Sequence, residues 1–305
     1  MKNTLTFLLF LTVSTVFAQD DLLDMLEKDN KPATTYTTAS FKATRIVNSH
    51  NVETLKKKHM DYVIGHRFGS LSDRPFYNFL GMDLGANTRM AFEYGITDAL
   101  TVGLGRNSSQ RTYDVYAKYR LIRQSQGLHA SPVTVTVFGS SAMITNDSDA
   151  SMTFTSNAQR QNYVTQIMVA RKFGERLTLQ VAPTFVYRGK VLAGDQTSLG
   201  AMGLGGRYKL TKRLSLNGEY YLTAPQSPLP TGDLKPRHNS FALGFDIETG
   251  GHVFQLHVTN SRSMIEKQFI AETTGDFLTG KQTLHFGFNI SRMFSLDRRA
   301  KTLYK

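Results

Sequence analysis

The side chains with the clearest chemical potential are His66 and Ser70, because a histidine can activate a serine hydroxyl as a nucleophile. A serine hydrolase also needs a third group, and many place the serine in a Gly-x-Ser-x-Gly turn, which this sequence lacks. The 8 histidines include no His-Glu-x-x-His spacing, and no cysteine is present to form a disulfide or a thiolate metal site. The sequence therefore predicts a non-enzyme with no catalytic residue, no cofactor and no metal.

A second chemical feature is a set of charged residues that alternate with apolar neighbours along most of the chain. On an alternating strand they share the face opposite the apolar residues, which in a transmembrane barrel is the lumen. The set comprises Arg67, Asp83, Arg89, Glu93, Asp114, Lys118, Arg120, Arg188, Arg207, Lys209, Glu219, Asp246 and Glu248. Its two signs nearly cancel, whereas an ion-selective pore exposes one sign at its constriction. We interpret the set as ion pairs that fill or stiffen a narrow lumen.

Strands are the elements that must position these charges, and their pattern is clearest in residues 83–96. Apolar, aromatic or hydroxyl side chains take the even positions, while Arg89 and Glu93 are among the odd ones. A period of two excludes a helix, whose apolar residues recur every three or four positions. Residues 112–121, 177–188, 240–248 and 284–291 repeat the split. Because only every second residue of such a wall faces lipid and must be apolar, the mean hydropathy can be as low as −0.28.

The alternation predicts an all-β fold, a single antiparallel up-and-down transmembrane barrel of about twelve strands. They are expected near 58–68, 81–96, 100–106, 111–122, 132–143, 161–172, 176–188, 197–210, 214–223, 239–249, 252–260 and 281–293. Tight turns at Asp98, Gly174, Lys212 and Gly250 alternate strictly with long polar stretches at 69–80, 144–160, 189–196, 224–238 and 260–280. Outer-membrane barrels have short periplasmic turns and longer outer loops, so the tight turns are expected in the periplasm.

The chain begins with the features of a secretory signal. Lys2 precedes an apolar run that is too short to cross a bilayer, and Ala18 lies at a peptidase site. Residues 1–18 are therefore expected to be removed by cleavage before Gln19 after Sec-type export. The barrel is assigned to residues 58–294 and a basic C-terminal tail to residues 295–305.

Residues 19–57 are predicted to form a short N-terminal helix and an extended segment outside the wall. A strand at residues 38–47 would give the barrel an odd number of strands, which does not fit a bacterial barrel. The segment is instead expected either to plug the lumen or to hang in the periplasm. In the lumen, the candidate plug residues Lys42 and Arg45 would meet acidic wall partners such as Glu93, Asp114 or Asp246.

The formal net charge of +12 is expected to lie largely outside the wall. Basic residues gather at positions 56–58 and in the C-terminal tail, where they can meet lipid headgroups or remain solvated. The expected partners are therefore outer-membrane lipid and a small solute or a periplasmic or envelope protein, and not nucleic acid.

Several motifs, taken in order, resemble a known family. His-Arg-Phe-Gly at 66–69, Tyr-Gly-Ile-Thr-Asp at 94–98 and Gly-Leu-Gly-Arg at 103–106 precede Tyr-Asp at 113–114 and Lys-Tyr-Arg-Leu-Ile-Arg-Gln at 118–124. The chain resembles an uncharacterised Bacteroidota outer-membrane β-barrel family, a domain of unknown function, over nearly its whole mature length. The resemblance implies a barrel and an outer-membrane address, and it brings no catalytic residues.

Two functions of different classes fit this architecture. The preferred one is a narrow porin-like channel or transporter for a small solute or an apolar molecule. About 8 strands already enclose a lumen that side chains can fill, so about twelve strands enclose a wider one. The alternative is a non-transporting envelope protein that uses the barrel as an anchor. A lipid-modifying barrel enzyme is a remote third possibility.

Overall fold

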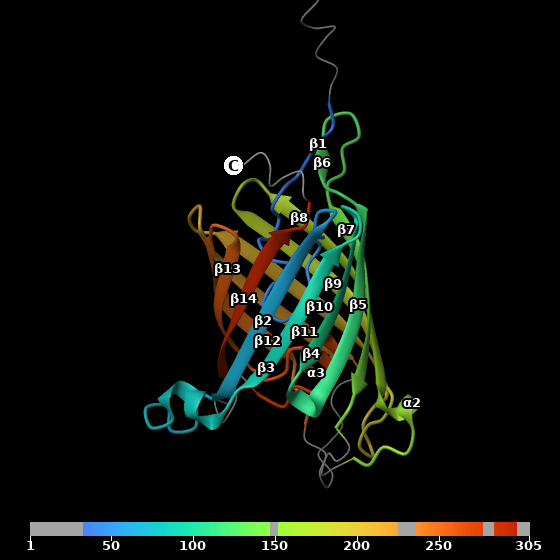
Figure 1. Cartoon of the computed structure of the whole chain (residues 1–305), viewed down its shortest axis with the longest axis vertical. Helices are drawn as coiled ribbons and strands as arrows, with labels where there is room; N and C mark the ends of the chain where they lie inside the picture. The colour runs from blue at the N-terminus through green and yellow to red at the C-terminus, as the bar shows by residue number, and fades with distance from the viewer. Residues whose placement is uncertain (1–32, 147–151, 225–235, 277–283, 298–305) are drawn as a thin grey trace, which may run out of the picture.

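The computed structural model describes residues 33–146, 152–224, 236–276 and 284–297 (Figure 1). Residues 1–32, which include the predicted signal peptide and short helix, lie outside this range, as do residues 298–305 of the basic tail. Twelve antiparallel strands form a closed barrel in which chain neighbours pair and the last strand pairs with the first. Closure satisfies every strand edge within the wall, which a bilayer requires because lipid offers no hydrogen bonds. The predicted fold class is confirmed.

The wall strands agree closely with the predicted ranges. They are β2 (His59–Ser70), β3 (Asn87–Gly95), β4 (Leu100–Asn107), β5 (Thr112–Ile122), β7 (Thr134–Ile144), β8 (Gln161–Phe173), β9 (Leu177–Arg188), β10 (Ser198–Lys209), β11 (Leu214–Ala224), β12 (Ser240–Thr249), β13 (His252–Thr259) and β14 (His285–Ser295). Along β9, Val181 is 43% exposed and points outward, while its neighbours Gln180 and Ala182 are 4% and 2% exposed. Alternate residues thus face lipid and lumen, as the period of two predicted.

One predicted strand begins too early. Residues 81–86 are not in the wall, because η1 (Phe79–Leu84) forms short 3-10 turns and β3 starts only at Asn87. Leu80 and Gly81 have φ values of 55° and 84°, which no strand can accommodate. A Cβ on Gly81 would lie 2.6 Å from the carbonyl oxygen of Gly69, so only glycine fits this contact. Asp83 is therefore an exposed loop residue, and its assignment to the lumen is wrong.

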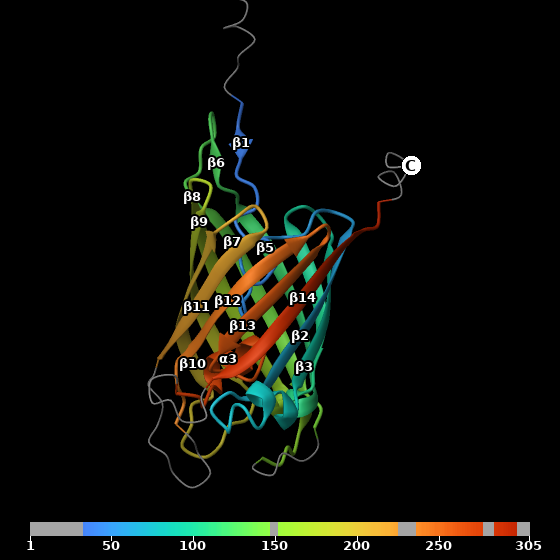
Figure 2. The ribbon, with the colours of Figure 1, turned by 90° about the vertical axis from the view of Figure 1, so that its left-hand side faces the viewer.

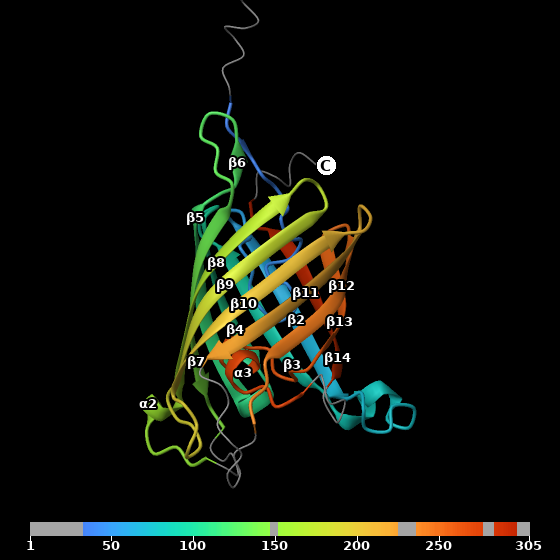
Figure 3. The same ribbon diagram turned by 180° about the vertical axis from the view of Figure 1, so that it is seen from behind.

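The connections define two ends of the barrel. The end that carries the tight turns at Asp98, Gly174, Lys212 and Gly250 is named the turn end, and the opposite end the loop end. The predicted strict alternation fails at two consecutive connections. η2 (Ser109–Arg111) makes a short connection at the loop end, whereas residues 123–133 make a longer one at the turn end. The longer one contains β6 (Ser125–Gln126), which pairs with β1 (Thr35–Tyr36) beyond the barrel mouth (Figures 1 and 3).

Two chain segments fill the interior (Figures 1 and 2). Residues 39–55, here named the plug segment, enter from the turn end and are largely buried. Residues 261–273, the inner loop, fold back from the loop end and contain α3 (Glu266–Ala271), whose six residues are all buried. The prediction that 260–280 is an outer loop is therefore wrong for this part. Phe269 and Ile270 are 0% exposed, and their burial in the lumen drives the inward turn.

A further helix among the described residues is α2 (Asn157–Arg160), one turn at the loop end. Among the described residues, no helix is long and apolar enough to cross a membrane.

The filled lumen as candidate functional site

A tight turn at the tip of the plug segment is bound by one wall carboxylate. The Ile46 N–H donates to the Ser49 carbonyl at 2.8 Å, which closes the turn. Glu219 on β11 accepts the backbone N–H groups of Val47, Asn48 and Ser49 at 3.2, 2.8 and 3.0 Å. It also accepts the Ser49 hydroxyl at 2.6 Å. Hydrogen bonds to a charged group are stronger than neutral ones, so the four that Glu219 accepts bind this turn firmly to β11.

Positively charged wall side chains bind backbone carbonyl oxygens of the plug segment. Lys118 on β5 is fully buried, and its Nζ donates to the carbonyls of Thr44 and Glu53 at 3.2 and 2.7 Å. Arg207 on β10 donates to the Ser40 carbonyl at 3.4 Å. The wall charges therefore pair with backbone dipoles of the plug segment as well as with each other.

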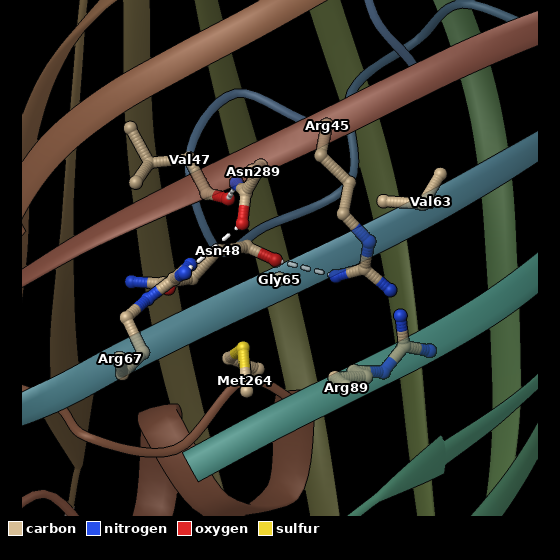
Figure 4. A pocket seen from close by; sticks show the side chains of 9 residues that line it. All are labelled: Arg45, Val47, Asn48, Val63, Gly65, Arg67, Arg89, Met264 and Asn289. Atoms are coloured by element: carbon tan, nitrogen blue, oxygen red, sulfur yellow. Dashed lines mark hydrogen bonds between the residues drawn. The ribbon is translucent and has the colours of Figure 1, made fainter. Parts of the chain in front are cut away.

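Arg67 on β2 reaches the same turn from the other side of the lumen (Figure 4). Its Nη2 donates to the Asn48 Oδ1 at 2.7 Å and its Nη1 to the Asn289 Oδ1 at 2.9 Å. The Asn289 amide in turn donates to the Val47 carbonyl at 2.9 Å. The turn is thus held between β2, β14 and β11.

Neutral wall side chains complete the contact along the plug segment. The Gln180 amide on β9 donates to the His50 carbonyl at 3.0 Å and accepts the Val52 N–H at 3.0 Å. The Thr136 hydroxyl on β7 donates to the Val52 carbonyl at 2.9 Å. Buried backbone N–H and C=O groups need hydrogen-bond partners. Because the plug segment is irregular, wall side chains supply the partners that a helix or sheet would otherwise provide.

The plug segment and the inner loop meet in the middle of the lumen. Arg45 Nη1 lies 3.1 Å from the Glu266 carboxylate of α3, and both side chains are at least nine-tenths buried. Arg45 Nη2 lies 2.8 Å from His50 Nε2, and the His50 ring packs at 4.8 and 4.6 Å from the rings of Tyr116 and Phe138. The two segments therefore close the lumen jointly, one from each end.

The charges predicted in the lumen separate into two groups. Those buried inside the wall are Arg67, Arg89, Glu93, Asp114, Lys118, Arg188, Arg207, Glu219 and Asp246. Arg120, Lys209 and Glu248 are partly exposed near the turn end. Arg89 and Asp114 form a direct pair at 2.5 Å, which is the kind of pairing that the balanced signs predicted.

The acidic partners predicted for the plug residues are wrong. Lys42 pairs with Glu248 at 2.5 Å, and Arg45 pairs with Glu266, rather than with Glu93, Asp114 or Asp246. Glu266 was missed because its loop looks polar. The apolar residues at 264, 265, 269 and 270 are the signal that could have identified a buried helix there.

Two small voids lie beside the plug segment in the described part of the chain. These voids, one of them drawn in Figure 4, have volumes of about 10 and 20 Å³ and share Arg45, Val63 and Asn289 in their walls. Each suits about one water molecule. Apolar packing fills the neighbouring space, where Ile46 and Val52 belong to one core with Phe138 and Phe269.

The serine and histidine first considered for catalysis lie on the outer side of β2. The His66 ring stacks on the Phe288 ring at 4.7 Å with an interplanar angle of 16°. Ser70 has the same parity on the strand, four residues further. The pair therefore lies on the lipid-facing surface of the wall, away from the lumen.

The chain is similar to several solved barrels at low identity and with TM-scores below 0.5. The NanC porin is 12% identical with a TM-score of 0.48, and the match covers 78% of this chain and 100% of the porin. The COG4313 outer membrane channel from Pseudomonas putida F1 is 12% identical with a TM-score of 0.49, over 81% and 100%. The KdgM porin is 9% identical with a TM-score of 0.44, over 77% and 99%. No curated protein matches the chain.

The family match is more extensive than these likenesses. Residues 41–294 match the membrane bound beta barrel domain DUF5777, so the match takes in nearly all of the plug segment, the inner loop and nearly the whole wall. This agrees with the predicted uncharacterised barrel family and with a membrane location. The chain belongs to the DUF5777 family of membrane bound beta barrel domains.

Proposed function

We propose that this protein is a porin-like channel of the bacterial outer membrane whose lumen is held closed by the plug segment. Small solutes pass when the plug segment leaves its wall contacts. The observation that carries this proposal is the polar lining beneath the plug segment, where Lys118, Gln180 and Glu219 bind its backbone.

The chemistry of that lining favours a removable filling. A core built only for stability is made from apolar side chains, because buried charges cost desolvation energy. Lys118 and Glu219 have hydrogen-bond partners whether the lumen is closed or open, because water can replace the plug backbone once it has left. Twelve strands also enclose more space than side chains alone need to fill.

A non-transporting envelope anchor is the second candidate. It is favoured by the apolar core that joins Ile46 and Val52 of the plug segment to Phe138, Met168 and Phe269. Such packing is typical of a protein interior that stays closed. Conductance measurements separate the two functions.

The first test weakens the plug turn at its carboxylate. In Glu219→Ala, four hydrogen bonds to residues 47–49 are lost. Hydrogen bonds to a charged group contribute about 1.5–3 kcal/mol, so the open fraction is expected to rise by roughly tenfold or more. Single-channel recording of the refolded mature chain in planar bilayers measures this as more frequent opening steps.

The matched control is Gln166→Ala, also on the lumen face. The Gln166 amide donates to Thr184 and Tyr221 of the wall, at 2.9 and 3.1 Å, and its loss should leave the opening frequency near that of the parent chain. If Glu219→Ala behaves like this control, the plug segment does not govern conductance.

The second test concerns orientation, which we infer to place the turn end in the periplasm, after cleavage before Gln19. The chain has no cysteine, so each introduced cysteine reports alone. Exposed Ser156 is at the loop end and exposed Lys212 in a tight turn. On intact cells, Ser156→Cys should react with an impermeant maleimide and Lys212→Cys should not. The reverse pattern contradicts this topology, and labelling of both only after lysis contradicts a surface-exposed loop end.

A further inference from the structure

The connection between β2 and β3, residues 71–86, is here named the lateral loop, and it exposes an unusual amount of apolar surface. Phe76 is 96% exposed, Tyr77 76%, Phe79 62% and Leu80 44%. Several large apolar side chains exposed side by side mark an interaction surface, because single exposed residues are common but clusters are not.

The lateral loop is held in an ordered conformation that keeps these side chains outward. The Asn78 amide donates to the Asp73 carbonyl at 2.6 Å, and the Leu80 N–H donates to the Pro75 carbonyl at 2.7 Å. Its base is fixed to the wall by the close contact of Gly81 with Gly69. The aromatic side chains therefore remain exposed although the backbone around them is tied.

The direction of the lateral loop identifies the surface that it meets. In Figures 1 and 3, which view the barrel from opposite sides, it projects sideways from the wall at the level where the strands end. The β1–β6 pair at the other end instead projects along the barrel axis. A sideways segment at the end of the wall lies over the surface of the surrounding bilayer.

The lateral loop also continues the lipid-facing surface of the wall. Just before it, the Phe68 ring stacks on Phe286 at 6.1 Å with an interplanar angle of 9°. Within it, the Arg74 guanidinium lies 4.8 Å from the centre of the Tyr77 ring, and the Arg74 side chain is 71% exposed. Aromatic rings concentrate at the membrane–water interface, and a guanidinium there can pair with phosphate groups.

We propose that the lateral loop lies in the headgroup layer of the adjacent membrane leaflet, with Phe76, Tyr77 and Phe79 inserted at the headgroup–acyl boundary. The lateral loop thereby anchors the barrel at the membrane interface and fixes its depth and tilt in the bilayer. The continuity with the aromatic wall and the sideways direction favour lipid over a protein partner or a second copy of the chain. A protein contact would bury the same side chains against protein and would not depend on lipid.

The experiment uses the absence of tryptophan from the chain. Phe76→Trp gives a single tryptophan, which can be excited selectively, in the mature protein refolded into phosphatidylcholine vesicles with or without bromine on the acyl chains near the headgroup. The expected result is a blue-shifted emission that brominated lipid quenches strongly and aqueous iodide quenches weakly. Tyr77→Trp repeats the measurement at the neighbouring site, which covers a failure of the first variant to fold.

The matched control is Leu128→Trp, in the connection at the turn end, where Leu128 is 65% exposed. That reporter should emit as in water, resist quenching by brominated lipid and be quenched by iodide. The proposal is overturned if the lateral-loop reporters behave like this control. It is also overturned if their emission is blue-shifted without lipid quenching, since that result indicates a protein contact.

Discussion

Deletion of residues 19–57 is expected to leave a folded barrel with a much larger conductance than the parent chain. The wall closes through pairing of β14 with β2 and needs no strand from the deleted part. Removal of the plug segment frees Lys118, Gln180 and Glu219 to bind water, so the lumen becomes a hydrated path bounded by the inner loop. Single-channel recording together with heat-modifiable migration on gels measures both expectations.

The control for this deletion removes residues 19–32 alone and keeps the plug segment, so its conductance should match that of the parent chain. An unchanged conductance after deletion of 19–57 would exclude the plug segment as the closing element. Failure of that deletion to assemble would show instead that the wall is stable only when the plug segment fills it. That result would favour the anchor function, in which the interior stays closed.

Substitution of the lipid-facing wall should have the largest effect on stability. Val181 lies near the middle of β9, between Val169 and Leu204 on the neighbouring strands, and points outward. In Val181→Arg a charge enters hydrocarbon, and the free energy of unfolding is expected to fall by about 2–4 kcal/mol for a site near the bilayer midplane. Denaturant titration of refolding into lipid vesicles measures this loss.

Val181→Leu is the matched control, because it keeps an apolar side chain against lipid and should change stability little. If arginine and leucine gave the same free energy of unfolding, Val181 would not face hydrocarbon and the assignment of the two wall faces would fail.

The wall could be predicted well because lipid imposes its period directly on the sequence. Every second residue must be apolar, so β9 was expected at residues 176–188 and is found at Leu177–Arg188. The alternation misled at residues 81–86, where it continues by coincidence through a turn. The left-handed backbone at Gly81 and its contact with Gly69 depend on the fold around them and leave no periodic trace.

The lumen could be predicted only in part. Strand parity places Lys118 and Glu219 inside, and counting strands excludes residues 38–47 from the wall. Parity cannot tell which groups meet across the lumen, because those contacts depend on how the closed barrel aligns distant strands. Glu266 illustrates the limit, since nothing in its local sequence connects it to Arg45, a residue 221 positions away.

The distances along the chain that separate the plug segment from its partners have a consequence for assembly. Thr44 is held by Lys118, 74 residues later, Val52 by Gln180, 128 residues later, and Asn48 by Glu219, 171 residues later. These partners lie on β5, β9 and β11, so their arrangement exists only once those strands stand together. The plug segment precedes every wall strand in the chain, yet it is expected to become ordered only after these strands have come together. The assembling barrel is therefore expected to have a hydrated interior before the plug segment binds.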